Sequence, residues 1–397
     1  MSVIGINGSF IRKPASGMGQ VSWHFIKQLI KMSSENKHLK SEFVIYLEDK
    51  IPSDFISDYN KVPANIKFKI VKSRLYKRDD LIRKVLWEKF WLPVQVKKDN
   101  CQSFLSLYQS ASILPKQIKH TMFVHDVIPN VFPEYLNNLR KKSYYWLVDR
   151  AVKQTYKIVT NSNFSKKEIA RTYNINHDKI KVSHLSCDPI FKKQLSEDER
   201  EDDLKKYGIK KSDKFILYEG GSDVRKNIGR IIEAYGRLVP EITNIPSLVI
   251  VGSFHKYLVP LVTDIEEKII EISSNYNVDR KLFKTVGFVE QEDLPALFQS
   301  AEIFIYPSLY EGFGMPVLEA MTSSTPVVTS NTTSIPEVIS QEAGYLVNNP
   351  EDIDEIKTQL KKALTDSEEN QSKKIALALQ ESKKFTWEKF VNKILEQ

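Results

Sequence analysis

The segment that decides the fold runs Tyr306-Pro-Ser-Leu-Tyr-Glu-Gly-Phe-Gly-Met-Pro-Val-Leu-Glu-Ala-Met321. The apolar residues before it predict a β-strand that ends at Tyr306. A helix is expected to begin near Pro316, because proline is tolerated in the first turn of a helix. The loop between them holds two glycines, which let a ligand approach the backbone closely. The free N–H groups at the start of the helix suit an anion.

Two carboxylates flank this loop. Glu311 stands in the loop and Glu319 in the first turns of the helix, eight residues further on. This spacing would let them contact different parts of one ligand. A solvated loop glutamate and a helix-capping glutamate are the alternative, and the residue types alone leave both interpretations open.

Short β-branched runs alternate with helical patterns along the whole chain. This alternation predicts an α/β fold with doubly wound parallel sheets. Strands are expected at Val3–Asn7, Phe43–Leu47, Ile66–Val71, Ser103–Leu107, Thr121–Val124, Ile158–Thr160, Phe215–Glu219, Leu248–Val251, Lys284–Val286, Ile303–Tyr306 and Val327–Thr329.

The strand–helix rhythm restarts after an acidic run at Glu197–Asp203, so two domains are expected. Thr386 is a plausible N-cap for a final amphipathic helix. The expected boundaries are 1–190 for the first domain, 191–213 for a linker, 214–380 for the second domain and 381–397 for a helix that packs back toward the first domain.

The net charge of +8 is divided unevenly along the chain. Residues 1–190 carry 32 Lys and Arg against 16 Asp and Glu, whereas residues 191–397 carry 26 against 34. A basic half suits nucleic acid, an anionic membrane or an acidic small molecule, with solubility as the plain alternative. No recognised nucleic-acid motif accompanies the charge, so no nucleic-acid partner is expected.

The segment 306–321 resembles the E-x7-E motif of retaining glycosyltransferases of family 4, which have the GT-B fold. Other segments resemble the motifs of that family in the same order along the chain. They are Gly17-Met18-Gly19, His125-Asp126, Thr160–Ser165, Gly220–Asn227, Ser334–Val338 and Gly344–Val347.

The resemblance implies two Rossmann-like domains that face a cleft, with a nucleotide-sugar on the second domain and the acceptor on the first. Glu319 would bind the ribose, Glu311 would lie beside the transferred sugar, and Arg225 with Lys226 would stabilise the leaving diphosphate. The residues implied in donor binding are Gly17, Gly19, Gly221, Arg225, Lys226, Gly312, Phe313, Gly314, Met315, Pro316, Val317 and Glu319.

Arg225 and Lys226 also support this role by residue type. They follow a predicted strand and a glycine pair, and two adjacent cations suit a diphosphate. A solvated turn is the alternative. No DxD-like motif stands at a strand end, so neither a metal nor another cofactor is expected.

His125 and Asp126 follow a predicted strand in the basic half. A lone histidine is more often a core or surface residue than a catalytic one. By resemblance, His125 lines the cleft near the sugar, and Asp126 orients it or touches the acceptor. The catalytic set implied by the resemblance is Glu311, His125, Asp126, Arg225 and Lys226.

The basic stretch Lys67–Lys98 holds 11 Lys and Arg against three acids, with interleaved aromatic residues. Asp79–Trp91 is expected to be an amphipathic helix on anionic lipid or, equally, a core helix with a solvated basic face. The sequence has no secretory signal or membrane-spanning run. A cytoplasmic protein at the inner face of a membrane is therefore expected.

The motif set most resembles the mannosyltransferase-like branch of O-antigen and lipopolysaccharide assembly. We therefore expect retaining, metal-independent transfer of a sugar, with mannose from GDP-mannose as the preferred donor. The acceptor would be a saccharide or a polyprenyl-linked saccharide. A UDP-sugar or dTDP-rhamnose donor is the alternative, and a sugar-nucleotide epimerase or a non-catalytic basic membrane-binding module ranks below both.

Overall fold

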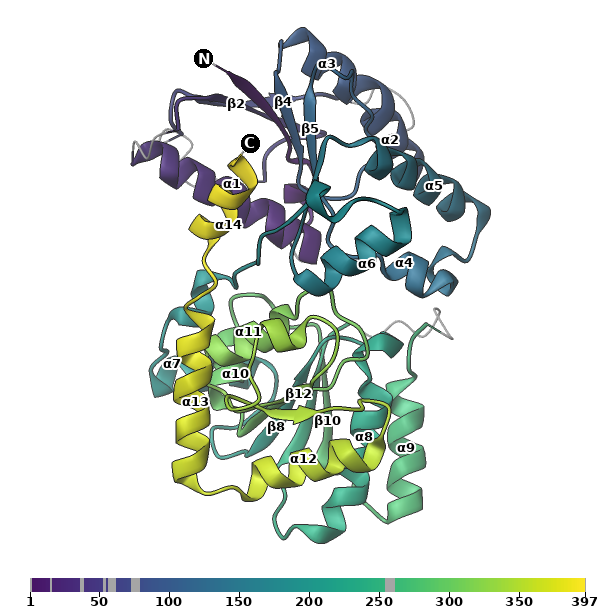
Figure 1. Cartoon of the computed structure of the whole chain (residues 1–397). Helices are drawn as coiled ribbons and strands as arrows, with labels where there is room; N and C mark the ends of the chain where they lie inside the picture. The colour runs from purple at the N-terminus through teal and green to yellow at the C-terminus, as the bar shows by residue number, and fades with distance from the viewer. Residues whose placement is uncertain are drawn as a thin grey trace. The chain divides into compact units, whose positions relative to one another are not determined.

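The computed structural model describes residues 2–14, 16–35, 39–52, 55, 62–72, 79–253 and 261–396. It divides into two compact units (Figure 1). Unit 1 comprises Met1–Leu185 and Trp387–Gln397, and unit 2 comprises Ser186–Thr386.

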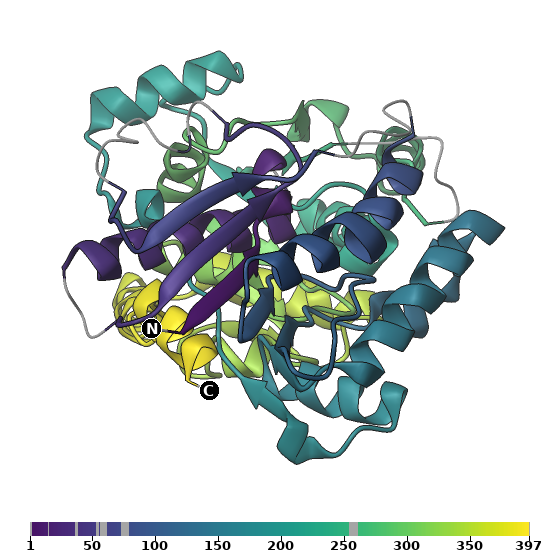
Figure 2. The same cartoon turned by 90° about the horizontal axis from the view of Figure 1, so that it is seen from above.

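Unit 1 is built on a parallel sheet with the strand order β3-β2-β1-β4-β5-β6-β7. Its strands are β1 Val3–Asn7, β2 Glu42–Leu47, β3 Ile66–Ile70, β4 Ser103–Ser106, β5 Lys119–Phe123, β6 Lys157–Thr160 and β7 Ile180–Val182. Its helices are α1 Gly17–Ser34, α2 Asp80–Leu86, α3 Leu92–Lys98, α4 Ile128–Val131, α5 Leu139–Gln154, α6 Asn163–Tyr173 and α14 Trp387–Leu395. Figure 2 shows the first strands between α1 on one side and the helices of residues 80–98 on the other.

Unit 2 repeats this plan with the strand order β10-β9-β8-β11-β12-β13, again all parallel. Its strands are β8 Phe215–Glu219, β9 Ser247–Val251, β10 Phe283–Gly287, β11 Ile303–Tyr306, β12 Val327–Ser330 and β13 Tyr345–Val347. Its helices are α7 Glu197–Lys206, α8 Ile228–Leu238, α9 Ile265–Tyr276, α10 Leu294–Ser300, α11 Met315–Thr322, α12 Ile353–Thr365 and α13 Glu368–Ser382.

The strand orders confirm the prediction of two doubly wound, Rossmann-like domains. In unit 1 the order reverses between β1 and β4, and in unit 2 between β8 and β11. Ligands of such sheets bind beyond the carboxyl ends of the strands at this reversal. The topology therefore predicts ligand sites at the loops after β8 and β11 in unit 2 and at those after β1 and β4 in unit 1.

The expected linker at 191–213 is instead part of unit 2. Ser196 and Glu199 form a capping box at the start of α7, and α7 packs on α10. Lys206 joins the two helices, because its Nζ lies 2.7 Å from Asp203 and 2.8 Å from Asp293. An acidic run is thus compatible with a helix when its first turn carries the carboxylates, as here.

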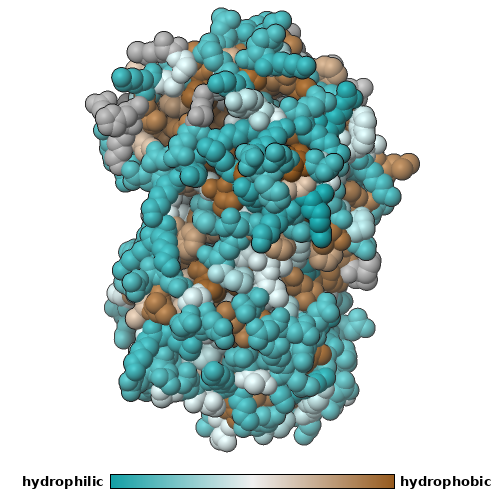
Figure 3. Space-filling view, viewed as in Figure 1, coloured by the Kyte–Doolittle hydropathy of each residue, from teal (hydrophilic) through white to brown (hydrophobic). Residues whose placement is uncertain are grey.

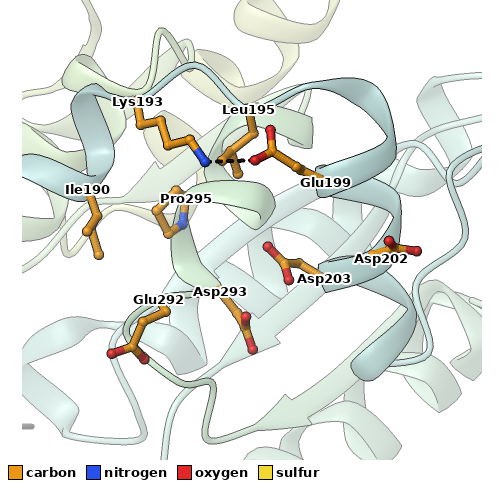
Figure 4. Close-up of a pocket in the computed structure, with 9 residues that line it drawn as sticks. All are labelled: Ile190, Lys193, Leu195, Glu199, Asp202, Asp203, Glu292, Asp293 and Pro295. Carbon is orange, nitrogen blue, oxygen red and sulfur yellow. Dashed lines mark hydrogen bonds and ion pairs between the residues drawn. The ribbon is translucent and has the colours of Figure 1, made fainter.

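A hollow of about 470 Å³ lies beside α7 and α10 (Figure 4). It is lined by Ile190, Lys193, Leu195, Glu199, Asp202, Asp203, Glu292, Asp293 and Pro295. The ammonium of Lys193 lies 2.7 Å from the carboxylate of Glu199. None of the predicted site residues lines this hollow.

The C-terminal segment divides between the units. Helix α13 belongs to unit 2, whereas α14 belongs to unit 1 and lies beside α1 (Figure 1). The ring of Trp387 stacks on His24 with centroids 4.8 Å apart, and Phe390 meets Phe25 edge to face. The aromatic face of α14 therefore completes the core of the first unit.

The visible surface is mostly hydrophilic (Figure 3). A small brown group stands at the right-hand edge of unit 1, near the beginning of α5. Among the described residues, no helix is long and apolar enough to cross a membrane.

Candidate active site

The loop between β11 and α11 holds Glu311 in a specific network. The hydroxyl of Tyr306 donates to Glu311 Oε1 at 2.7 Å, and the hydroxyl of Ser308 donates to the same atom at 3.1 Å. Ser334 donates to the backbone carbonyl of Glu311 at 2.9 Å. Glu311 is thus placed at the carboxyl end of the strand, as the sequence predicted.

Arg225 comes to the same place from another part of the chain. It lies in the 3₁₀ turn Val224–Lys226 after β8, where Asp223 Oδ1 accepts from its backbone N–H. Its Nη1 donates to Glu311 Oε1 at 3.4 Å and to the carbonyl of Tyr310 at 3.3 Å. Only 16% of the Arg225 side chain and 13% of the Glu311 side chain are exposed. The structure therefore pairs two residues that were predicted from separate motifs.

Two close backbone contacts shape the turn before Arg225. Gly221 and Gly252 have φ angles of 70° and 139°, in the region that favours glycine. A Cβ on Gly252 would lie 2.2 Å from the backbone nitrogen of Gly221. A Cβ on Gly220 would lie 3.0 Å from Cδ of Lys226, so the stem of that lysine lies close to the turn. The glycines thus bring the cationic turn close to β8 and β9.

Asn227 locks this turn onto the Glu311 loop. It adopts a left-handed φ of 68°, and its amide donates to the carbonyls of Pro307 and Pro350 at 2.9 and 2.6 Å. The N–H of Leu309 also donates to the carbonyl of Arg225 at 2.7 Å. The loops after β8 and β11 are therefore held together by the side chain of Asn227 and by one backbone hydrogen bond.

Glu319 lies half-buried in the second turn of α11, as predicted. Burial raises the pKa of its carboxyl group well above the usual value, and the negative charges of Glu219 and Asp188 raise it further, against the effect of Lys226. Burial also raises the pKa of Glu219, at the end of β8. A carboxyl group in such surroundings gains from hydroxyl donors or from an added positive charge.

Gly314 sets the direction of α11. It has a φ of 106°, and a Cβ there would lie 2.6 Å from Cδ1 of Ile335. Pro316 stands in the first turn, as the sequence predicted. The first N–H groups of a helix lack intrahelical acceptors, so this end can receive an anion. Of the other predicted donor residues here, Gly312 and Phe313 of the loop and Val317 of α11 are buried, and Met315 of α11 is half-buried.

In unit 1, His125 follows β5 and its ring is buried. Its Nε2 lies 3.2 Å from the carbonyl of Leu107, which can only accept, so Nε2 carries the proton. Burial lowers the pKa of His125 to about 4. The ring is therefore neutral at pH 7, with Nδ1 unprotonated. Asp126 Oδ1 accepts from the N–H of Ile128 at 3.0 Å, at the start of α4.

The predicted glycine loop forms the beginning of α1. Ser16 caps the helix and accepts from the N–H of Gly19 at 3.1 Å. A Cβ on Gly19 would lie 1.8 Å from the carbonyl oxygen of Lys13, whereas a Cβ on Gly17 would meet nothing within 4 Å. Gly19 is thus required by the turn itself, and Gly17 leaves open space beside the backbone.

A buried polar network in unit 1 was not predicted from the sequence. Glu88 is fully buried and accepts from the hydroxyls of Tyr108 and Tyr144 at 2.8 and 3.1 Å, and from the N–H of Ala111 at 2.8 Å. The ammonium of Lys84 lies 3.8 Å from Glu88. The network connects the end of β1 to the loop after β4, since Asn7 also donates to Tyr108.

No group of three or more His, Cys, Asp or Glu side chains that would hold a metal ion occurs in the part of the chain that the structure describes. Arg225 and Lys226 place two positive charges in the turn after β8.

Comparisons with known proteins give the family. Residues 199–378 match the family model described as glycosyl transferases group 1. The chain is 34% identical to the O-antigen chain mannosyltransferase B of Escherichia coli over 278 residues. This alignment covers 69% of each chain. The chain belongs to the group 1 glycosyltransferases.

Two further proteins extend the comparison. This glycosyltransferase is 27% identical to the O-antigen chain mannosyltransferase RfbU of Salmonella typhimurium over 354 residues. That alignment covers 87% of each chain. The crystal structure of WaaG, a glycosyltransferase involved in lipopolysaccharide biosynthesis, shares the fold with a TM-score of 0.69 at 17% identity over 98% of both chains.

Several residues that shape the candidate site were not predicted from the sequence. Tyr306 and Ser308 hold Glu311, and Asp223 Oδ2 lies 3.4 Å from Nε of Arg225. Tyr306 and Ser308 sit within the quoted segment, so their hydroxyls were visible but had no distinguishing spacing. Gly252 follows a strand, which is the one sequence signal that pointed to it.

Proposed function

We propose that this glycosyltransferase moves mannose from GDP-mannose to a saccharide or lipid-linked saccharide acceptor of a surface polysaccharide. The observation that carries the proposal is the Arg225–Glu311 pair at the carboxyl ends of β8 and β11. Both curated relatives described above are named as O-antigen chain mannosyltransferases. Their names support mannose as the sugar.

The proposed donor site lies in unit 2. The diphosphate binds Arg225 and Lys226, because a guanidinium and an ammonium together match its charge and its paired oxygens. The distal phosphate and the sugar hydroxyls accept from N–H groups of the Glu311 loop and the start of α11. Glu319 accepts from the ribose hydroxyls.

Arg225 exchanges partners when the donor binds in this account. The carboxylate of Glu311 contacts its guanidinium at 3.4 Å in the structure. A diphosphate carries more charge than a carboxylate and therefore takes over the guanidinium. Glu311 remains held by Tyr306 and Ser308 and is then available to the hydroxyls of the sugar.

The reaction retains the anomeric configuration. The bond between the anomeric carbon and the phosphate oxygen breaks, and the acceptor oxygen forms the new bond on the same face. The acceptor proton passes to the departing phosphate, so the products are a mannosylated acceptor and GDP. Arg225 and Lys226 stabilise the charge that develops on the diphosphate, and they do so without a metal ion.

The acceptor is proposed to bind unit 1 near His125. The neutral ring offers Nδ1 as an acceptor for a sugar hydroxyl, since Nε2 is engaged by Leu107. A lipid-linked acceptor would place the enzyme at the cytoplasmic face of an anionic membrane. The excess of basic residues in 1–190 supports that location.

Incubation with radiolabelled sugar nucleotides tests the proposal. The panel contains GDP-mannose, UDP-sugars and dTDP-rhamnose, each with an O-antigen-type saccharide acceptor. Transfer from GDP-mannose is the expected result. Transfer from another donor would replace the assignment of mannose, and isomerisation of the donor without an acceptor would indicate an epimerase.

A further inference from the structure

The outward face of α5 carries large apolar side chains that are exposed and do not contribute to the core of unit 1. Leu139 and Trp146 are 81% and 59% exposed, and they lie seven residues apart on the helix. Lys142, Arg150 and Lys153 are exposed and fall on the same face by their spacing of three and four residues. This outward face thus combines two large apolar side chains with three cations, and Asp149, a half-buried carboxylate, lies at its margin.

The opposite face of α5 anchors the helix. Val148, Ala151 and Val152 are buried in the core of unit 1, and the hydroxyl of Tyr144 donates to Glu88. The folding of α5 is thus accounted for without Leu139 or Trp146. Figure 3 shows a hydrophobic group among hydrophilic neighbours where α5 begins in Figure 1.

Several side chains of the stretch 79–91, which the sequence made a candidate for lipid binding, make contacts within unit 1 instead. Trp87 is 1% exposed, and its ring N–H donates to the carbonyl of Val71 at 2.7 Å. Arg83 lies between carboxylates of Glu48 and Asp80, and the ammonium of Lys84 lies about 5 Å from three aromatic rings. Trp87 thus packs in the core, as the core-helix alternative expects, whereas Arg83 and Lys84 are half-buried and do not form a solvated basic face. Tyr76, Lys77 and Arg78 lie outside the described residues.

We propose that the outward face of α5 is the surface by which the enzyme binds an anionic lipid bilayer. Tryptophan and leucine on a basic helix insert at the boundary between headgroups and acyl chains. The three cations attract anionic headgroups, and salt screens that attraction. The proposal rests on the membrane location proposed above and names the residues responsible.

The position of α5 fits this role within unit 1. The chain leaves β5 at its carboxyl end, passes through His125 and α4, and then returns along α5 to the start of β6. Helix α5 therefore begins at the edge of the sheet that holds His125. A bilayer contacting its first turns would present lipid-linked saccharides at that edge.

A second exposed apolar pair provides an internal comparison. Phe90 and Val94 are 56% and 54% exposed, at the π-helical turn Trp87–Trp91 and in α3. Lys97 and Lys98 are the exposed cations that follow. Helix α5 has the larger cationic face, so we expect it to make the greater contribution.

The test measures binding to vesicles of phosphatidylglycerol with phosphatidylcholine, and to vesicles of phosphatidylcholine alone. The first variant combines Lys142→Glu, Arg150→Glu and Lys153→Glu, and the second combines Leu139→Ser with Trp146→Ser. The control combines Lys210→Glu, Lys362→Glu and Lys383→Glu, exposed lysines of unit 2 that give the same change of net charge. Circular dichroism verifies folding, and transfer to a short soluble acceptor verifies activity.

We expect the native enzyme to bind anionic vesicles and to bind neutral ones weakly. The charge variant should lose binding by about 100-fold or more, because each cation near an anionic surface contributes roughly fivefold. The apolar variant should lose the salt-resistant part of binding, and the control should bind like the native enzyme. Transfer to the soluble acceptor should persist in all of them.

The negative outcomes of this experiment contradict different parts of the proposal. Equal binding by the native enzyme and both α5 variants would overturn the assignment to α5 and leave the membrane location standing. No binding of the native enzyme to either vesicle would overturn both the assignment and the membrane location, but not sugar transfer. Loss of binding in the control to the same extent would show that net charge alone is responsible and would overturn the assignment.

Discussion

The guanidinium Nη1 of Arg225 lies 3.4 Å from the carboxylate Oε1 of Glu311, although the two residues stand 86 positions apart in the chain. Tyr306 and Ser308 donate to the same carboxylate oxygen. The half-buried pair stands where the loops after β8 and β11 meet. In the proposed function a donor diphosphate competes with Glu311 for Arg225, and this competition leads to the first two predictions.

Replacing Arg225 should remove much of the catalysis. Arg225→Ala is expected to lower turnover by about 100-fold or more, the scale for losing one preorganised charge-stabilising donor. Steady-state kinetics with GDP-mannose provides the measurement. Arg237→Ala is the matched control, because that guanidinium pairs with Glu233 on the same unit and should leave turnover unchanged. Near-normal turnover of Arg225→Ala would remove Arg225 from the mechanism.

Substitution of Glu319 and substitution of Glu311 should have different effects on the binding of GDP. Glu319→Ala should weaken the binding of GDP by roughly 1–3 kcal/mol, because hydrogen bonds to the ribose are lost. Glu311→Gln should bind GDP at least as tightly as the native enzyme, since a competitor for Arg225 is gone, yet it should transfer mannose poorly. Calorimetric titration with GDP distinguishes the two. If Glu311→Gln bound GDP more weakly, the competition between carboxylate and diphosphate would be wrong.

Two buried histidines should make stability depend on pH. Burial lowers the pKa of His125 to about 4 and that of His120 to about 3, below the unfolded value of about 6.5. The unfolded chain therefore binds more protons below pH 6.5, so stability is full above that pH and falls as the pH drops toward 4. Urea unfolding at pH 7 and pH 5 measures this loss. His125→Gln should show a smaller loss than the native enzyme, and an unchanged loss would contradict the burial of a neutral ring.

The two glycines at the start of α1 should differ in what they affect. Gly19→Ala is expected to destabilise unit 1 by about 1–3 kcal/mol, because its Cβ would collide with the carbonyl of Lys13. Gly17→Ala has open space and should leave the melting temperature unchanged. Thermal unfolding of the two variants measures the difference. Equal melting temperatures would contradict the close contact between Gly19 and the carbonyl of Lys13.

The buried Glu88 network should behave as a unit. Lys84→Met leaves a buried carboxylate without its cation and is expected to cost about 3–5 kcal/mol of stability. The double variant Lys84→Met with Glu88→Gln removes the charge and should recover part of that loss. A double-mutant cycle from denaturant unfolding measures the coupling. Additive effects would show that Lys84 and Glu88 act independently.

Much of the fold was predictable because its strands are continuous apolar runs. Val3–Asn7, Phe215–Glu219 and Ile303–Tyr306 have the predicted bounds, since parallel strands covered on both faces need no polar residue. Strands β7 and β13 have only three residues each and were not predicted. Such short runs show no recognisable periodicity. They form strands because they pair with β6 and β12 in the folded sheets.

The positions of Glu311, Gly314 and Glu319 were predictable, because one continuous stretch from the end of β11 into α11 carries all three. The site was not predictable where partners come from distant segments. In the sequence, Glu88 is one of three acids in the basic stretch Lys67–Lys98. In the structure it is fully buried. The tyrosines that satisfy it stand 20 and 56 positions away, and only the tertiary structure brings them to it.

The anomeric configuration of the product formed in excess EDTA tests whether this enzyme retains the configuration of the sugar without a metal ion. NMR of the isolated product, made by the native enzyme from GDP-mannose and a saccharide acceptor, determines the linkage. We expect transfer without added metal, with mannose in the same anomeric configuration as in the donor. A product of inverted configuration, or activity that returns only with magnesium or manganese, would contradict a retaining transfer driven by Arg225 and Lys226.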